Sequence, residues 1–140
     1  MKVDPEIDTD RVLIPPMLMQ PFVENAIWHG LMQATNDSLL SIDIRQHDNA
    51  LRCVIEDNGI GRARSNQNKS KSKSASYKKS MGMDITKNRL KLLYDEQQNN
   101  KFMVITDLYD AQGEPCGTRV QLDIPLKFAD DTVDFKSSTI

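Results

Sequence analysis

Alternating apolar and polar residues predict two β-hairpins in this 140-residue chain. SLLSIDIRQH (38–47) and ALRCVIED (50–57) alternate around a short Asp-Asn turn, which is typical of antiparallel strands that each bury one face. KFMVITDLY (101–109) and GTRVQLDIP (117–125) repeat the pattern on either side of a turn that contains Gly113. We therefore expect four strands, arranged as two hairpins.

A helix is predicted before the first hairpin. Pro15 and Pro16 set up its start, because proline is well tolerated in the first turn of a helix. We expect the helix to run to about Leu31, with a break or kink near Gln20 caused by Pro21.

The remaining segments complete an α+β pattern. Residues 83–97 predict a second helix, and residues 11–14 predict a strand or an extended lead-in to the first helix. The tail 127–140 has no clear periodicity, so we expect it to be loosely ordered. The order of helices and hairpins predicts a two-layer α/β sandwich with helices on one face of a mixed, mainly antiparallel sheet.

The stretch PFVENAIWHG (21–30) carries more polar chemistry than an amphipathic helix needs. Five residues share its apolar side at helical spacing: Phe22, Val23, Ala26, Ile27 and Gly30. Glu24, Asn25 and His29 lie outside this apolar side. They are either solvated on a surface helix or part of a site, and this stretch alone does not decide between the two.

The overall composition, with 39% hydrophobic and 27% charged residues, is typical of a globular domain. The sequence has no apolar run near the roughly 20 residues that cross a bilayer, and its start does not resemble a signal peptide. We therefore expect a cytoplasmic location. Cys53 and Cys116 form no CxxC pair and are expected to be reduced thiols.

Positive charge is concentrated in RARSNQNKSKSKSASYKKS (62–80), which contains no acidic residue although the net charge of the chain is −2. Such a polar segment cannot bury enough apolar surface to fold alone, so we expect a mobile loop. Tyr77 is its only aromatic residue, which argues against a nucleic-acid-binding arm, because such arms stack bases on aromatic rings.

Three glycine motifs follow the polar helix. DNGIG (57–61) places a carboxylate at a strand end, with glycines that let the backbone turn and approach a ligand. SMGMDITKNRL (80–90) places Gly82 before a helix, where backbone N–H groups favour an anion. The pair Gly117-Thr118 opens a strand. Each motif alone also fits an ordinary turn, helix start or strand.

Taken together, the order and spacing of these motifs resemble the ATP-binding catalytic domain of LytS-like sensor histidine kinases. This domain belongs to the superfamily of DNA gyrase, the heat-shock chaperone and the MutL mismatch-repair ATPase. IPPMLMQPFVENAIWHG (14–30) is very close to the pattern that introduces the family's nucleotide-binding helix. The resemblance implies a Bergerat-type ATP-binding fold over residues 1–126, with an ATP lid at 62–81 and a tail at 127–140.

The resemblance also implies roles for the polar residues of the first helix. Glu24 matches the base that polarises the acceptor histidine. Asn25 matches the residue that holds Mg²⁺, a cation that prefers oxygen ligands. His29 lies where the family commonly has a basic or imidazole group near the phosphates, although a helix-surface histidine is an equal alternative.

The glycine motifs match the remaining parts of a nucleotide site. Asp57 matches the aspartate that accepts a hydrogen bond from the adenine amino group, and Thr118 matches the threonine that closes the adenine pocket. Three further positions match residues around the base or the phosphates: Gly59, Gly61 and Gly82. Met83, which stands where many relatives have Leu in the second glycine motif, is also expected to contact the nucleotide. Ser80 and Ile85 depart from the second glycine motif of many relatives, which have Gly and Asn there.

The implied function is that of a protein histidine kinase catalytic domain. It would hold ATP and Mg²⁺ and present the γ-phosphate to a histidine on a separate dimerisation domain of the same kinase, with a response regulator as the later partner. Membrane attachment would come only through other parts of a longer protein, and we expect no nucleic-acid partner. We expect no autophosphorylation of the isolated chain, because neither His29 nor His47 matches an acceptor.

Two other functions remain open from the sequence. One is an anti-sigma-factor serine kinase of the same superfamily. The other is a nucleotide-sensing module without transfer activity, which the departures at Ser80 and Ile85 keep open.

Overall fold

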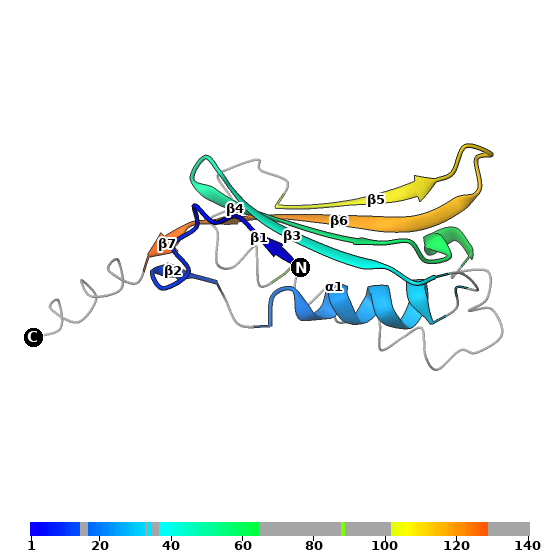
Figure 1. The fold of residues 1–140 in the computed structure, drawn as a ribbon, viewed down its shortest axis with the longest axis horizontal. Coiled ribbons are helices and arrows are strands. Elements are labelled where there is room, and N and C mark those ends of the chain that lie inside the picture. The colour runs from blue at the N-terminus through cyan, green and yellow to red at the C-terminus, as the bar shows by residue number, and fades with distance from the viewer. Residues whose placement is uncertain (15–16, 33, 35–36, 65–87, 89–101, 129–140) are drawn as a thin grey trace, which may run out of the picture.

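The computed structural model describes residues 1–14, 17–32, 34, 37–64, 88 and 102–128. The elements in chain order are β1 (Lys2–Val3), β2 (Val12–Leu13), α1 (Gln20–Asn25), the π-helix η1 (Ala26–Leu31), β3 (Leu40–His47), β4 (Ala50–Asp57), β5 (Met103–Tyr109), β6 (Pro115–Pro125) and β7 (Lys127–Phe128). Five strands form a sheet in the order β1-β3-β4-β6-β5, and α1 lies along one of its faces (Figure 1). The described part of the chain is thus α+β, with a mixed five-stranded sheet.

The two predicted hairpins form the centre of this sheet. β3 pairs antiparallel with β4, β5 pairs antiparallel with β6, and β4 and β6 pair with each other. The turn between β3 and β4 falls at Asp48 and Asn49, as predicted, and Asp48 has a positive φ of 53°. β1, for which we made no prediction, pairs parallel with β3 and makes the sheet mixed.

The core lies between the sheet and the helical layer. Seven strand residues face it and are buried: Ile44, Leu51, Cys53, Ile55, Val120, Leu122 and Ile124. From the helical side, Phe22 is only 2% exposed and packs into the same cluster. Burial of a large apolar side chain contributes about 1.5–3 kcal/mol, so this layer supplies much of the driving force for folding.

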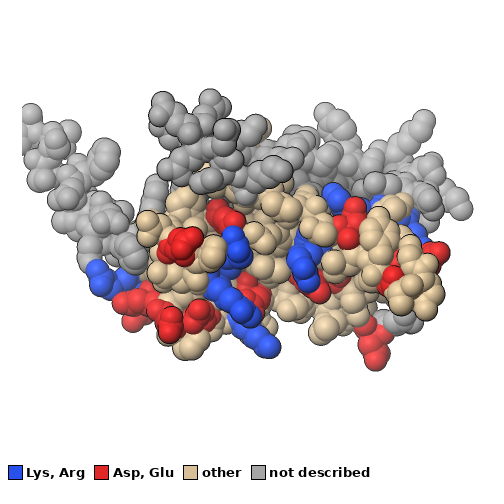
Figure 2. All heavy atoms as spheres, turned by 90° about the horizontal axis from the view of Figure 1, so that it is seen from above, with Lys and Arg blue, Asp and Glu red and all other residues tan. Residues whose placement is uncertain are grey.

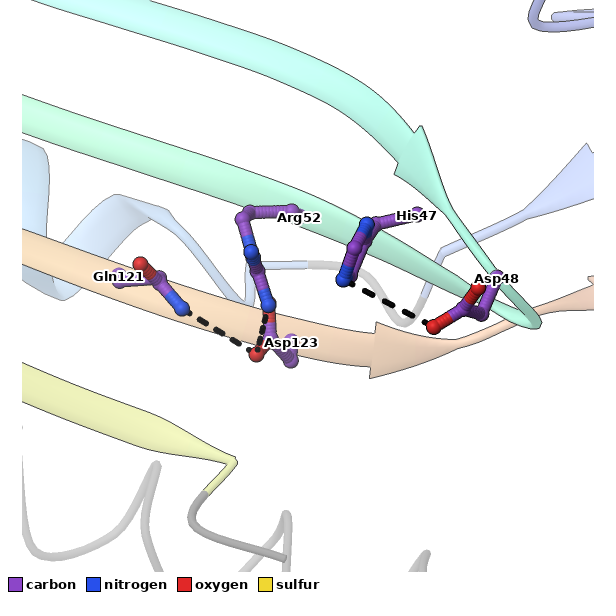
Figure 3. A network of polar contacts seen from close by, with 5 residues as sticks. All are labelled: His47, Asp48, Arg52, Gln121 and Asp123. Carbon is purple, nitrogen blue, oxygen red and sulfur yellow. Dashed lines mark hydrogen bonds and ion pairs between the residues drawn. The ribbon is translucent and has the colours of Figure 1, made fainter.

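The opposite face of the sheet is polar, and Figure 2 shows acidic and basic side chains interspersed on it. Arg52 of β4 and Asp123 of β6 are register partners and form a bidentate pair, with N–O distances of 2.8 and 3.1 Å (Figure 3). Arg119 and Glu56, also register partners, are joined at 2.7 Å. Opposite charges placed directly across two strands favour this register over its alternatives.

The first helix differs in two ways from the prediction. It begins at Gln20 and not near Pro15 and Pro16, and residues 17–19 are not helical. The break predicted near Gln20 is thus present as the start of the helix, and Pro21 occupies the first turn, where the missing N–H costs nothing. Ile27 is 39% exposed and lies outside the buried stripe, which contains Phe22 and Ala26. Gly30 is buried in line with Phe22 and Ala26, four residues apart in each case, and Ile27 lies beside this narrow stripe and not within it.

Two segments expected to be irregular are partly regular. Residues 61–64, at the start of the predicted loop, form a helical turn. Lys127–Phe128, the start of the predicted tail, forms β7 and pairs with β2. The rest of the predicted lid and tail lies outside the described residues. The predicted helix 83–97 also lies outside them except for residue 88, which is helical.

The structure also bears on membrane crossing. Among the described residues, no helix has the length and apolar character needed to cross a bilayer.

A matched pair of valines tests the assignment of the two sheet faces. Val120 faces the core and is 5% exposed, whereas Val104 on the neighbouring strand is 40% exposed. We expect Val120→Ala to lower the free energy of unfolding by about 2 kcal/mol, because it removes buried methyl groups and leaves a cavity. Val104→Ala should cost less than about 1 kcal/mol. Urea denaturation measures both values, and equal losses would contradict the assigned faces.

Candidate functional site

Three neighbouring strands change from apolar to polar side chains at the same level of the sheet. The helix-facing residues are Leu51, Cys53, Ile55 and Asp57 on β4; Ile124, Leu122, Val120 and Thr118 on β6; and Met103, Ile105 and Asp107 on β5. Asp57 is the register partner of Thr118, and Thr118 is that of Asp107. Because register partners share a face, these three residues form a polar row that closes one end of the core.

Asp57 is the most deeply buried acidic group among the described residues, with 5% of its surface exposed. Burial raises the pKa of its carboxyl above the ordinary value, whereas backbone hydrogen bonds from Gly59 and Thr118 oppose this rise. The Gly59 N–H donates to Oδ1 at 2.9 Å. No lysine or arginine of the described residues forms an ion pair with it. Asp57 is thus a desolvated acceptor held by the backbone.

Glycines surround this carboxylate because the backbone approaches it closely. A Cβ on Gly30, in η1, would lie 2.5 Å from Asp57 Oδ1. A Cβ on Gly59 would overlap the backbone of Gly30, and one on Gly117 would overlap the carbonyl oxygen of Asp57. Side chains at these positions would push the helix end and the two strand ends apart. The packing at this end of the molecule therefore depends on glycine.

The loop after β4 is tied to the neighbouring segments. The Asn58 side chain accepts a hydrogen bond from the Leu39 N–H at 2.7 Å and donates to the Asp37 carbonyl at 2.8 Å. The Ile60 N–H donates to the Gly30 carbonyl of η1 at 3.4 Å. These bonds hold the loop that begins with Asp57 against both the segment before β3 and the helix end.

A short helical turn follows this loop and contacts the β5–β6 hairpin. Arg62 donates two hydrogen bonds to Asp107, from Nε at 2.6 Å and from a terminal nitrogen at 2.9 Å. Arg64 forms a single ion pair with Glu114 at 2.8 Å. Gly61, the first residue of this turn, has a φ of +75°, a conformation that suits glycine. The first residues of the predicted lid are therefore attached to the sheet.

Glu24 and Asn25 lie on α1 with different exposure. Glu24 is exposed, and its Oε1 accepts a hydrogen bond from the Gln20 side chain one turn earlier at 2.8 Å. Asn25 is half-buried at the end of α1, and its side chain makes no capping hydrogen bond to η1. His29 lies in η1, but its side chain is outside what the structure describes. The helix thus offers a free carboxylate oxygen and an amide oxygen.

The structure brings together four of the residues predicted for a nucleotide site, although it does not test their roles. Asp57, Gly59, Gly61 and Thr118 lie at one end of the sheet, on one strand end, the loop after it and the adjoining strand. Gly82 and Met83, predicted beside the phosphates, lie outside the described residues, as do Ser80 and Ile85.

Three further residues of this site had no predicted role. Gly30 matched only the apolar side of the helix, and Gly117 only the opening of a strand, because close backbone approach leaves no mark in local periodicity. Asp107 could have been found from KFMVITDLY, since it falls in phase with Met103 and Ile105, at a position where the alternation predicts an apolar residue.

Comparison with known proteins finds several sensor proteins, whereas no protein-family model matches the chain. The sensor protein LytS of Oceanobacillus iheyensis is 48% identical over 48 residues, covering 34% of this chain and 8% of the relative. The sensor histidine kinase YpdA of Escherichia coli is 31% identical over 83 residues, covering 59% of this chain and 14% of the relative. The sensor protein LytS of Streptococcus mutans is 27% identical over 129 residues, covering 91% and 21%.

These similarities support a relationship with sensor histidine kinases. The chain matches at most 21% of the length of these three relatives. It therefore corresponds to a part of each relative.

The raised pKa of Asp57 predicts how stability depends on pH. We expect the free energy of unfolding of the wild type, relative to Asp57→Asn, to fall as the pH rises from below 3.8 through the raised pKa of folded Asp57, and then to stay constant. The unfolded chain ionises first, so each further rise in pH favours unfolding, by at most about 1.4 kcal/mol per pH unit.

Urea denaturation of both proteins between about pH 3.5 and pH 7 measures this difference. The comparison cancels the opposite trends of Asp107 and Asp123, whose pKa values are lowered by hydrogen bonds from Arg62 and Arg52. A difference that stays constant, or one that grows in favour of the wild type as the pH rises, would contradict the desolvated state of Asp57.

Proposed function

We propose that this chain is the ATP-binding catalytic domain of a two-component sensor histidine kinase. In this proposal the domain binds Mg-ATP at the end of the sheet marked by Asp57. It then presents the γ-phosphate to a histidine on a separate dimerisation domain, from which the phosphoryl group passes to a response regulator. The similarity to sensor histidine kinases supports the class of protein, and the environment of Asp57 supports the nucleotide site.

The observation that carries the proposal is a buried carboxylate without a cationic partner among the described residues. Burying a charge costs free energy unless the group is paired, so an uncompensated carboxylate at this position needs another reason. A carboxylate can accept about four hydrogen bonds, and two backbone donors, from Gly59 and Thr118, leave capacity for more. An exocyclic amino group of adenine, which donates hydrogen bonds, fits this remaining capacity.

The neighbouring residues fit the other parts of a bound nucleotide. The buried Thr118 lies next to Asp57 on the same face of the sheet and can contribute its hydroxyl to the pocket wall. Asn25 offers the amide oxygen that would hold Mg²⁺, which when bound neutralises charge on the phosphates. Its side chain is not used to cap the next helical segment, which is consistent with this role.

Glu24 fits the part of a general base for the acceptor histidine. Its exposed position lets another domain reach it, and Gln20 holds one carboxylate oxygen while the other stays available. Glu24 would accept the proton from one ring nitrogen of that histidine as the other nitrogen attacks the γ-phosphate, the bond between the γ-phosphorus and the bridging oxygen breaks, and ADP leaves. The contribution of the protein is then mostly the positioning of nucleotide and acceptor.

Substitution of Asp57 tests the nucleotide site. We expect Asp57→Ala and Asp57→Asn to weaken ATP binding by about 1 to 3 kcal/mol, because the adenine amino group would face a missing or mismatched partner. Glu56→Gln is the matched control, since Glu56 lies one residue earlier and pairs with Arg119 instead. Titration calorimetry measures the affinities. If the Asp57 variants bind ATP as tightly as the control, Asp57 is not part of the site.

Substitutions of Glu24 and Asn25 test ATP binding and phosphoryl transfer separately. Asn25→Ala should weaken Mg²⁺-dependent ATP binding, because it removes an oxygen ligand. Glu24→Gln keeps the shape of the side chain and should leave ATP affinity nearly unchanged, while slowing transfer to an added acceptor domain by roughly 100-fold or more. Transfer of labelled phosphate from ATP measures the rate. Wild-type transfer by Glu24→Gln, or labelling of the isolated chain at His29 or His47, would contradict these roles.

A further inference from the structure

We propose that Arg62 is a positioning residue for the base of the bound nucleotide, acting through its bidentate contact with Asp107. This inference rests on the proposed function and extends it to a residue without an assigned role. Arg62 holds the loop that begins at Asp57, and thereby sets the orientation of the carboxylate that contacts the base.

The position of Arg62 in the chain supports this role. The loop leaves β4 at Asp57, and Arg62 is the fifth residue after it. Arg62 contacts Asp107 on β5, and β6 lies between β4 and β5 in the sheet. The loop therefore crosses β6 near Pro115 and Gly117, just before Thr118, and both of its ends are attached to the polar row.

The geometry of the contact suits positioning better than general stabilisation. A guanidinium that meets a carboxylate with two parallel hydrogen bonds fixes distance and direction together. The two side chains are 44% and 33% exposed, and exposed ion pairs contribute little to folding stability. The Arg62 hydrogen bond lowers the pKa of Asp107, so the carboxylate stays ionised and able to pair at neutral pH.

Arg64 provides a matched control on the same helical turn. Its ion pair with Glu114 uses one hydrogen bond, at 2.8 Å. The side chains of Arg64 and Glu114 are 52% and 59% exposed. Glu114 lies beyond Tyr109, the last residue of β5, and is not part of the polar row. Loss of this pair removes a charge and a contact of the same kind without releasing the loop from that row.

The experiment compares two nucleotides that differ in the group that Asp57 would contact. We would measure the affinities for ATP and for purine riboside triphosphate, which lacks the 6-amino group. The proteins compared are the wild type, Arg62→Met, Asp107→Asn, Arg64→Met and the exchanged pair Arg62→Asp with Asp107→Arg. We expect Arg62→Met and Asp107→Asn to lose roughly tenfold in ATP affinity, the size of one misaligned hydrogen bond. Their affinity for the analogue should not change.

The ratio of the two affinities identifies each outcome. Arg64→Met should keep the wild-type ratio, and the exchanged pair should recover part of it. The inference is overturned if Arg62→Met and Asp107→Asn keep the wild-type preference for ATP, if Arg64→Met lowers it equally, or if both nucleotides weaken together. A wild-type protein that binds both nucleotides equally, or neither, contradicts the proposed function itself and overturns the inference with it.

Discussion

The close approach of the backbone around the Asp57 carboxylate is the constraint on which this end of the molecule depends. The end of η1, the loop after β4 and the start of β6 meet there, although they are far apart in the sequence. Each contributes a glycine, Gly30, Gly59 and Gly117, at a place where a Cβ would overlap its neighbour. The contact therefore fixes both the position of the helix end on the sheet and the shape of the proposed base pocket.

The same arrangement places a cost inside the fold. The core of aliphatic side chains favours folding. It ends in a polar row that contains a buried carboxylate, and burial of this carboxylate opposes folding. Ile55 in the core and Asp57 in the polar row are consecutive residues on the helix-facing side of β4. Natural proteins accept such local costs mainly at functional sites, where a group must be ready for a ligand. On the opposite face of the sheet, the adjacent cross-strand pair of Glu56 with Arg119 joins β4 to β6 beneath this site.

Local patterns predicted the parts of the fold that depend on neighbouring residues. The two hairpins followed from alternation, and the turn at Asp48 from its sequence. Features that depend on distant contacts were not predictable: the parallel pairing of β1, the pairing of β7 with β2, the π-helical turn η1, and the attachment of Arg62 to Asp107. For the site, motif order indicated Asp57 and Thr118, but it carried no information about which backbones touch.

The glycine packing around Asp57 has a consequence for how such domains would diverge. Gly30, Gly59 and Gly117 are required by the packing of the fold, whether or not a nucleotide binds. Desolvation of Asp57 opposes folding, and in the proposed function the bound nucleotide would offset this cost. In a lineage released from nucleotide binding, drift would remove the aspartate while the glycines persisted. The retained aspartate, more than the retained glycines, would therefore mark an active descendant.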